Sequence, residues 1–231
     1  MAKGHEVQAM FDSIAGRYDL LNRVMTLGQD QRWRRFVVDK VGDPGPEAWL
    51  LDLATGTGDI AALFSEKYPD AQIIGADFSQ NMLQEAKRRM GARPINWQAC
   101  DANQLPFADN SLRAVTFGYL LRNVADVAQV LTEINRVLVP GGIVVSLDTT
   151  PPAKNILYPF IRAYLRWGIP LLGRVLALDQ GAYSYLTQST MEFYGAEALA
   201  GIFQEAGFAD VAHKRFMAGT IAVHWGRKVS A

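Results

Sequence analysis

The sequence predicts a single α/β domain in which a doubly wound, mostly parallel sheet is covered by helices on both faces. Short apolar runs of strand length alternate with helical patterns from residue 49 to residue 147, which is typical of a parallel sheet. A chain of 231 residues with 49% apolar side chains can bury one core, and no polar linker divides it. We expect residues 1–41 to form a helical cap and residues 153–180 to form an apolar helical insertion.

The cap is predicted from two helical patterns. Apolar residues recur at helix spacing at Val7, Met10, Phe11 and Ile14, and a second apolar and basic stretch covers residues 29–41. The glycine- and proline-rich segment 42–46 ends these helices. The nearly continuous apolar run over residues 49–54 then predicts a buried strand.

The elements that follow alternate in type. Helices are predicted after Asp59, over residues 79–90 and over residues 126–137. Strands are predicted over residues 72–78, 95–99, 114–119 and 143–147, the last of them after a Pro140-Gly141-Gly142 turn. Strands separated by helices pair in parallel, so the sheet has one edge at which all their carboxyl ends meet.

The segment 156–178 is the most membrane-like part of the chain, but it is a poor candidate for a spanning helix. Arg162, Arg166 and Arg174 interrupt its apolar residues, and Pro159 and Pro170 break the helical hydrogen bonding. Attachment to a membrane surface through an amphipathic face is compatible with this pattern, and so is a helical hairpin that covers the core.

The last elements predict an antiparallel hairpin. A helix is expected over residues 196–205, and strands are expected over residues 210–216 and 220–225. Only the turn Met217-Ala218-Gly219 separates the two strands, and so short a connection requires antiparallel pairing.

Composition excludes several classes of function. The 23 basic and 23 acidic side chains give no net charge, which disfavours a nucleic-acid partner. Cys100 is the single cysteine, so no intrachain disulfide or multi-cysteine metal site is possible, and we predict no metal. Residues 1–8 carry no apolar signal-peptide core, so we expect a cytoplasmic location.

A glycine loop follows the first strand. Residues 54–59 read ATGTGD, and the glycines Gly56 and Gly58 allow backbone angles and close approaches that other residues resist. Open parallel sheets bind ligands at this end of their strands. Together with Ala61, the loop also matches the G-x-G-x-x-A pattern of nicotinamide-binding proteins, so the loop alone leaves the cofactor class open.

Acidic residues stand at three strand ends. Asp77 closes the second strand, where its carboxylate could accept hydrogen bonds from ribose hydroxyls. Asp52 and Asp101 stand near the ends of the first and third strands. A carboxylate repels a pyrophosphate but attracts an ammonium and a sulfonium, so this charge pattern favours S-adenosyl-L-methionine over a dinucleotide. Asp52 and Asp101 could instead cap turns, and Asp59 could cap the following helix.

These features lead to a family resemblance. Residues 48–148, with their glycine loop, acidic strand ends and Pro-Gly-Gly turn, resemble the class I methyltransferases. Further segments resemble the menaquinone and ubiquinone biosynthesis C-methyltransferases: FDSIA at 11–15 with Tyr18-Asp19, Leu27-Gly28 with Arg32-Trp33, LRNV at 121–124, Arg136-Val137-Leu138, residues 183–186, and AVHWG at 222–226. The resemblance covers nearly the whole chain.

The resemblance implies a fold and a set of donor-binding residues. It implies a Rossmann-like sheet of seven strands whose last strand is antiparallel, and direct donor contacts at Thr57, Asp77, Asp101 and Ala102. We predict the following donor-binding residues: Tyr18, Asp52, Gly56, Thr57, Gly58, Asp77, Asp101, Ala102 and Gly118. The chain has Leu120 where the family usually has glycine, which would reshape the acceptor pocket.

The resemblance also implies the reaction, which is C-methylation of a prenylated quinol, with demethylmenaquinol as the expected acceptor. A methoxy-polyprenyl-benzoquinol, another small molecule or RNA are the alternatives. The insertion 153–180 would lie over the acceptor site and guide a tail out of a membrane surface, at the inner face of the membrane. The helix that carries Phe11 and Tyr18 could close over the donor.

Four residues are candidates for the chemistry of transfer to an electron-rich quinolate carbon. Arg122 stays protonated, so we expect it to orient a water or to stabilise oxyanion charge. Asn123 could hold a quinol oxygen or cap the helix near Asp126. His224 and Tyr185 could assist proton removal, although a lone His or Tyr is more often a packing residue.

Three other functions compete with this interpretation. A nicotinamide oxidoreductase would share the glycine loop, but Asp52 and the absence of a Tyr-x-x-x-Lys pair count against it. A nucleic-acid methyltransferase could use the basic residues at 32–35 and 87–89, but basic helix faces are usually only solvated. A noncatalytic donor-binding protein would be excluded only by turnover.

Overall fold

The computed structural model describes residues 23, 26, 28–152, 158–163, 168 and 188–230. Within these residues the chain forms one sheet of seven strands in the order β3-β2-β1-β4-β5-β7-β6. The strands are β1 (Trp49–Leu53), β2 (Gln72–Asp77), β3 (Ile95–Ala99), β4 (Leu112–Gly118), β5 (Leu138–Thr149), β6 (Phe208–Phe216) and β7 (Ile221–Lys228). Strands β1 to β5 pair in parallel, and β7 is antiparallel to both β5 and β6. The predicted doubly wound sheet with an antiparallel C-terminal hairpin is confirmed.

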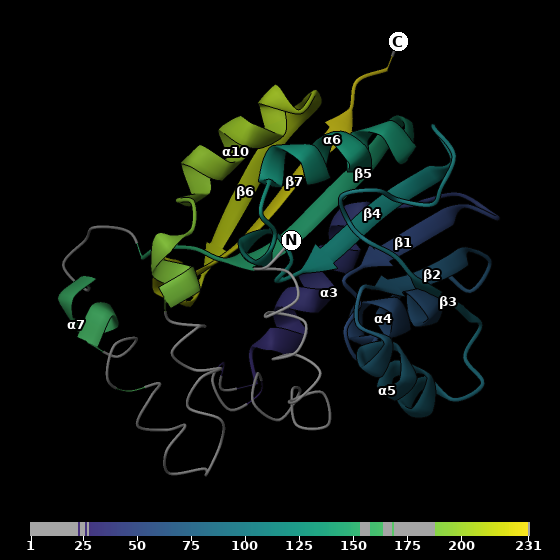
Figure 1. Ribbon diagram of the computed structural model, residues 1–231, viewed down its shortest axis with the longest axis horizontal. Coiled ribbons are helices and arrows are strands. Elements are labelled where there is room, and N and C mark those ends of the chain that lie inside the picture. The colour runs from purple at the N-terminus through teal and green to yellow at the C-terminus, as the bar shows by residue number, and fades with distance from the viewer. Residues whose placement is uncertain are drawn as a thin grey trace.

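Helices cover both faces of this sheet (Figure 1). The helices are α3 (Asp30–Val41), α4 (Asp59–Lys67), α5 (Gln80–Met90), the 3₁₀ turn η2 (Leu121–Asn123), α6 (Val127–Val137), α7 (Tyr158–Ala163), α10 (Ala196–Glu205) and the 3₁₀ turn η4 (Met217–Gly219). One core cluster contains side chains of α3 and α4, and the other contains side chains of α6 and α10. None of the helices in the described part of the chain is long and apolar enough to cross a membrane.

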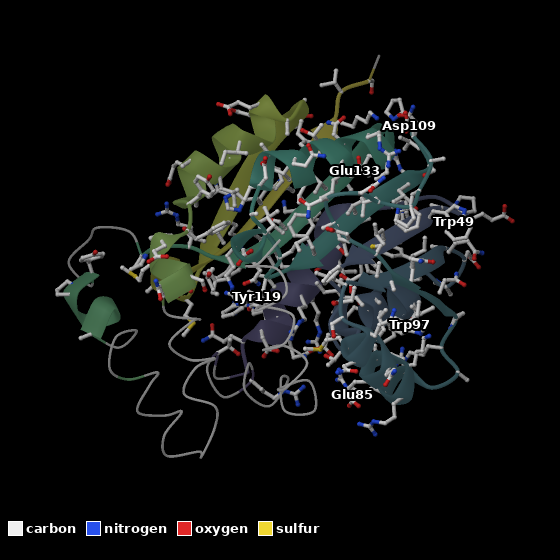
Figure 2. All side chains as sticks on the ribbon, in the orientation of Figure 1. Trp49, Glu85, Trp97, Asp109, Tyr119 and Glu133 are labelled. Atoms are coloured by element: carbon white, nitrogen blue, oxygen red, sulfur yellow. The ribbon has the colours of Figure 1, made fainter. Side chains whose placement is uncertain are left out.

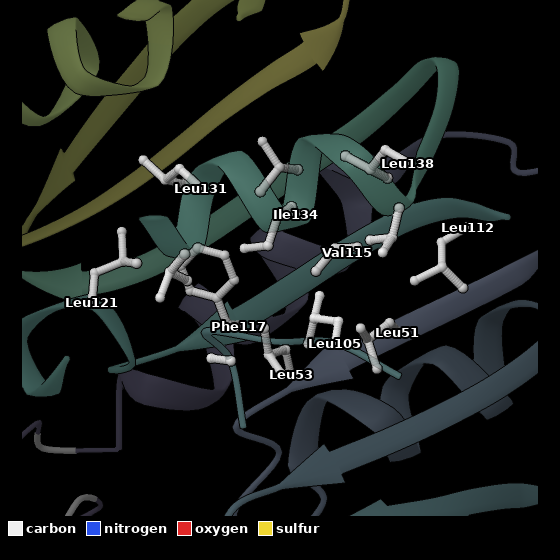
Figure 3. Close-up of a cluster of buried hydrophobic side chains, with 14 of the residues drawn as sticks. Leu51, Leu53, Leu105, Leu112, Val115, Phe117, Leu121, Leu131, Ile134 and Leu138 are labelled. Atoms are coloured by element: carbon white, nitrogen blue, oxygen red, sulfur yellow. The ribbon is translucent and has the colours of Figure 1, made fainter. Parts of the chain in front are cut away.

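The helix starts follow from local chemistry. Ser79 caps α5 by accepting a hydrogen bond from the Met82 amide at 3.1 Å. Asp126 caps α6 in the same way, with the Gln129 amide at 3.0 Å. The apolar stripe of α6 then packs Leu131 and Ile134 onto Val115 and Phe117 of β4 (Figure 3). These helices are thereby fixed against the strands whose ends carry the predicted site residues.

One element differs from the prediction. The Pro140-Gly141-Gly142 segment is not a turn before β5 but lies inside it, next to a register shift against β4 between Leu112 and Ala114. Gly141 has a φ of +72°, and a Cβ on Gly142 would lie 2.8 Å from the Val139 carbonyl oxygen. The glycines therefore lie in an irregularity of the strand, which pairs with β4 before it at Leu138 and after it from Ile143.

Several predicted features lie outside the described residues. They are the first cap helix with Phe11 and Tyr18, most of the insertion 153–180, and Tyr185.

Candidate functional site

The predicted site residues that the structure describes, except His224, lie at one edge of the sheet, where the parallel strands end (Figure 1). Asp52 and the glycine loop lie at the end of β1, and Asp77 is the last residue of β2. Gly118 ends β4, and Arg122 lies just beyond it in η2. The topology thus brings together residues that are up to 70 positions apart, since strand order places β1 between β2 and β4.

The glycines of the loop have different tasks. Gly58 has a φ of +91°, and a Cβ there would lie 2.8 Å from the Trp97 ring, so Gly58 serves packing against β3. Gly56 has a φ of +56°, and nothing lies within 4 Å of the place of its missing Cβ. A left-handed backbone beside open space is what close approach of a ligand to the loop requires. Gly56 therefore fits a bound donor.

Asp77 connects the loop to the next helix. One carboxylate oxygen accepts a hydrogen bond from the Gly56 amide at 2.8 Å, and the other accepts one from the Ser79 amide at 2.9 Å. The side chain is only partly buried. A partly exposed carboxylate at a strand end is the kind of group that can accept hydrogen bonds from the hydroxyl groups of a ribose. The carboxylate and Gly56 therefore lie side by side at this end of the strands.

Asp52 is almost fully buried, although we expected its carboxylate to attract a cationic donor. Its carboxyl group is 1% exposed, and it accepts hydrogen bonds from the Thr55 hydroxyl at 2.6 Å and the Ala61 amide at 3.1 Å. Burial raises the pKa of Asp52 to about 7, although these hydrogen bonds and the charge of Arg34 oppose the rise. Asp52 therefore ties the loop to α4.

An ion-pair network behind the loop was not found by sequence reasoning. Asp59, the first residue of α4, pairs with Arg34 of α3 at 3.1 Å and with Arg89 of α5 at 3.1 Å. Arg89 also donates to the Thr57 carbonyl at 2.9 Å, and the buried Arg34 pairs with Asp30. Arg34 and Arg89 therefore brace three helices and the loop, rather than forming basic faces. In the sequence Arg34 stands in a run of basic residues, and only the structure shows that it shares the buried face of α3 with Trp33 and Val38.

The other residues predicted to bind the donor differ in how far they are buried. Asp101 is exposed and accepts hydrogen bonds from the backbone amide and the side-chain amide of Asn103, at 2.9 and 2.7 Å, so it closes a turn. Ala102 and Thr57 are buried. Gly118 is half-buried, and a Cβ there would make an ordinary contact with Ile60 at 3.7 Å.

Arg122 is a buried cation just beyond the end of β4. Its Nη1 donates to the Thr149 hydroxyl at 3.1 Å and lies 3.8 Å from the Asp148 carboxylate. Its guanidinium carbon is 5.0 Å from the centre of the Tyr119 ring. The Nε atom is buried and has no hydrogen-bond partner among the described residues. A buried guanidinium with an unused N–H group is suited to bind an oxyanion.

Asn123 and Leu120 shape the same turn. The Asn123 amide donates to the Tyr119 carbonyl at 2.6 Å, and Tyr119 has the uncommon φ of +60°. Asn123 therefore holds a strained turn at the end of β4, and the cap of α6 is Asp126 instead. Leu120, at the position where the family usually has glycine, has a φ of −86° that any residue adopts, and it packs against the core.

His224 has the packing role that the sequence left open for it. The imidazole is 1% exposed in the middle of β7, and its Nε2 is 2.9 Å from the Ala196 carbonyl oxygen. The ring stacks on Phe203 of α10, with 5.9 Å between the ring centres. Burial lowers the pKa of His224 to about 4. The structure does not place this residue at the strand ends with Arg122.

Comparison with known proteins adds independent findings. A family model described as the ubiE/COQ5 methyltransferase family matches residues 1–228. A protein of Desulfotalea psychrophila, named ubiquinone/menaquinone biosynthesis C-methyltransferase UbiE, is 65% identical over 99% of this chain and 92% of its own length. The demethylmenaquinone methyltransferase of Thermus thermophilus is 42% identical over 94% of this chain and 99% of its own length.

Solved structures agree on the fold. Phosphoethanolamine N-methyltransferase 2 of Haemonchus contortus, in complex with S-adenosyl-L-methionine, has a TM-score of 0.66 at 16% identity. The similarity covers 86% of this chain and 53% of that protein. A putative methyltransferase of Bacillus halodurans has a TM-score of 0.61 at 18% identity, over 85% of this chain and 99% of its own.

Proposed function

The chain belongs to the ubiE/COQ5 methyltransferase family, and we propose that it transfers the methyl group of S-adenosylmethionine to a ring carbon of demethylmenaquinol. The observation that carries this proposal is one edge of the sheet at which two kinds of group meet. The partly exposed carboxylate of Asp77 lies beside the open Gly56, and the buried guanidinium of Arg122 follows the neighbouring strand. The first pair suits a cationic donor, and the guanidinium suits an anionic acceptor.

On the donor side, this chain's residues bind and orient. The bound donor supplies an electrophilic methyl group on a sulfonium. Asp77 accepts hydrogen bonds from the ribose hydroxyls, and Gly56 admits the donor against the backbone because no Cβ is in the way. Thr57 is buried in the same loop, and Gly58 lets the loop pack against Trp97. These contacts hold the loop in one conformation. A fixed donor position contributes to the rate by alignment.

On the acceptor side, Arg122 favours the ionised quinol. The ring carbon becomes a nucleophile when a neighbouring hydroxyl loses its proton, and a guanidinium stabilises the resulting oxyanion. Arg122 remains protonated throughout, so it stabilises charge or orients a water and does not remove the ring proton. Asn123 keeps Arg122 in place by holding the carbonyl of Tyr119. Tyr18 and Tyr185 remain candidates for closing over the donor and for proton removal.

A benzoquinol is the second candidate acceptor, because the 65% identical relative is named for both the ubiquinone and the menaquinone pathway. The test offers isotope-labelled S-adenosylmethionine with reduced demethylmenaquinone and, separately, with the reduced methoxy-polyprenyl-benzoquinone, and identifies products by mass spectrometry. We expect label in the naphthoquinol, and none when the same quinone is supplied oxidised. Label in the benzoquinol alone would show that the acceptor is a benzoquinol instead of a naphthoquinol. Label in neither quinol would refute the proposal.

A prenylated acceptor lies in a membrane, so we further propose that the protein works from the cytoplasm at the inner membrane surface. The apolar and arginine-rich composition of residues 156–178 supports this. Replacing both Leu165 and Trp167 with Ser should reduce cosedimentation with anionic liposomes. Equal binding by the variant and the unmodified chain would count against attachment through this segment.

A further inference from the structure

The carboxyl group of Asp148 lies directly behind Arg122. Asp148 is near the carboxyl end of β5, the strand next to β4, and its side chain is 1% exposed. It accepts hydrogen bonds from the Thr149 amide at 2.8 Å and from the Arg122 amide at 3.4 Å. The same carboxylate lies 3.8 Å from the Arg122 guanidinium. One side chain therefore contacts both the backbone and the charged group of Arg122.

Neighbouring groups also hold the guanidinium of Arg122 in place. The Thr149 hydroxyl accepts a hydrogen bond from Arg122 and another from the Thr190 hydroxyl, each at 3.1 Å. The Tyr119 ring lies 5.0 Å from the guanidinium carbon. An arginine side chain has much rotamer freedom, and holding it before the substrate arrives removes that entropy cost from the reaction. Among the residues that the structure describes, these contacts hold the guanidinium in one orientation.

We propose that Asp148 is a positioning residue, which holds Arg122 in the orientation that stabilises the acceptor oxyanion. This inference rests on the proposed quinol methylation. Asp148 itself does not touch the reacting atoms, and it acts through Arg122. Burial raises the pKa of Asp148, and the adjacent guanidinium opposes that rise, so the two groups depend on each other for their charge. A buried arginine without this carboxylate would have neither its ion partner nor its backbone anchor.

The test is a double-mutant cycle with Asp148→Asn, Arg122→Gln and the double variant. We expect Asp148→Asn to lower kcat about tenfold or more and to leave the KM for S-adenosylmethionine unchanged. In the Arg122→Gln background, the same Asp148 substitution should have almost no further effect. A merely structural role of Asp148 would instead lower activity by the same factor in both backgrounds.

Glu133→Gln is the matched control. Glu133 also accepts a hydrogen bond from a backbone amide, that of Leu105 at 2.8 Å, and pairs with Arg136 at 2.7 Å, but it belongs to α6 and lies apart from Tyr119 (Figure 2). This variant should keep the kcat of the unmodified chain. If Asp148→Asn does not fold, Thr149→Val replaces it, because it removes one hydrogen bond from Arg122 and should lower kcat in the same coupled manner.

The outcomes separate the two proposals. Methylation of a quinol by the unmodified chain, with independent effects at Asp148 and Arg122, overturns the positioning role and leaves the function standing. A full kcat in Asp148→Asn would also overturn the positioning role and leave the proposed function standing. An unmodified chain that methylates no quinol overturns both.

Discussion

The buried Asp52 makes a quantitative prediction about stability and pH. Its pKa rises from an ordinary 3.8 to about 7 in the folded chain, chiefly because burial disfavours the charged form. One pKa unit corresponds to about 1.4 kcal/mol, so ionising this group in the folded protein costs about 4 kcal/mol. Asp52→Asn removes the ionisation and keeps an oxygen that can accept from Thr55 and Ala61.

The direction in which stability changes with pH follows from proton linkage. A carboxyl group with a raised folded pKa contributes stability that is complete below pH 3.8 and is lost as the pH rises through about 7. The unmodified chain should therefore lose stability relative to Asp52→Asn by about 1.4 kcal/mol per pH unit between roughly pH 4 and pH 7. Above that range the difference should become constant.

Urea unfolding of both proteins at several pH values from 5 to about 8.5 measures this difference. Thr55→Val serves as a second variant, because it removes a hydrogen bond that lowers the pKa of Asp52 and should move the plateau to higher pH. A difference between the unmodified chain and Asp52→Asn that does not change with pH would refute the assignment of Asp52 as a buried, partly protonated group.

Asp77→Ala and Gly56→Val test the donor side, and Arg34→Met tests the ion-pair network behind it. Asp77→Ala removes charge-assisted hydrogen bonds and should weaken S-adenosylmethionine binding about tenfold or more by calorimetry; unchanged affinity would exclude Asp77 from the ribose site. Gly56→Val and Gly45→Val both place a side chain at a positive φ with free space around it, and both should lower the melting temperature. Only Gly56→Val should abolish donor binding, and equal binding by the two variants would contradict a donor at the loop. Arg34→Met leaves Asp59 without one of its partners and should destabilise the chain by about 3 kcal/mol in urea unfolding, whereas a change below about 1 kcal/mol would show that the network is not needed.

The fold was readable from the sequence because its signals are local. The apolar run at Leu50 and Leu51 and the helical pattern of Val130 and Ile134 each lie within one element, and their alternation predicts a parallel sheet. The Pro140-Gly141-Gly142 segment misled this reasoning. Those residues usually end a strand, and only the pairing of Leu138 and Ile143 with β4 shows that the strand continues on both sides of them.

The positions of the site residues were predictable, but their environments were not. The alternation of elements predicts that Asp52 and Asp77 stand at neighbouring strand ends. The depth of Asp52, its hydrogen bonds and its raised pKa depend on the folded surroundings, which include the backbone amide of Ala61 in α4, nine residues away. Asp52 and Asp101 both stand near strand ends in the sequence. The sequence alone therefore could not show that Asp52 is buried and Asp101 is exposed.

Long-range pairing explains the residues that sequence reasoning missed or left open. Arg34 appears in a run of basic residues, and only the fold shows that it is buried against Asp30 and Asp59. Asp148 follows no motif at all, and its position behind Arg122 comes from the pairing of β4 with β5.

The most direct test of the proposed reaction follows the methyl group itself. The purified protein is supplied with S-adenosylmethionine that carries ¹³C in its methyl group and with reduced demethylmenaquinone, and the extracted product is analysed by carbon NMR. A methyl resonance bonded to a ring carbon is the result that this account predicts. A methoxy resonance, or label that stays on the donor, would contradict it.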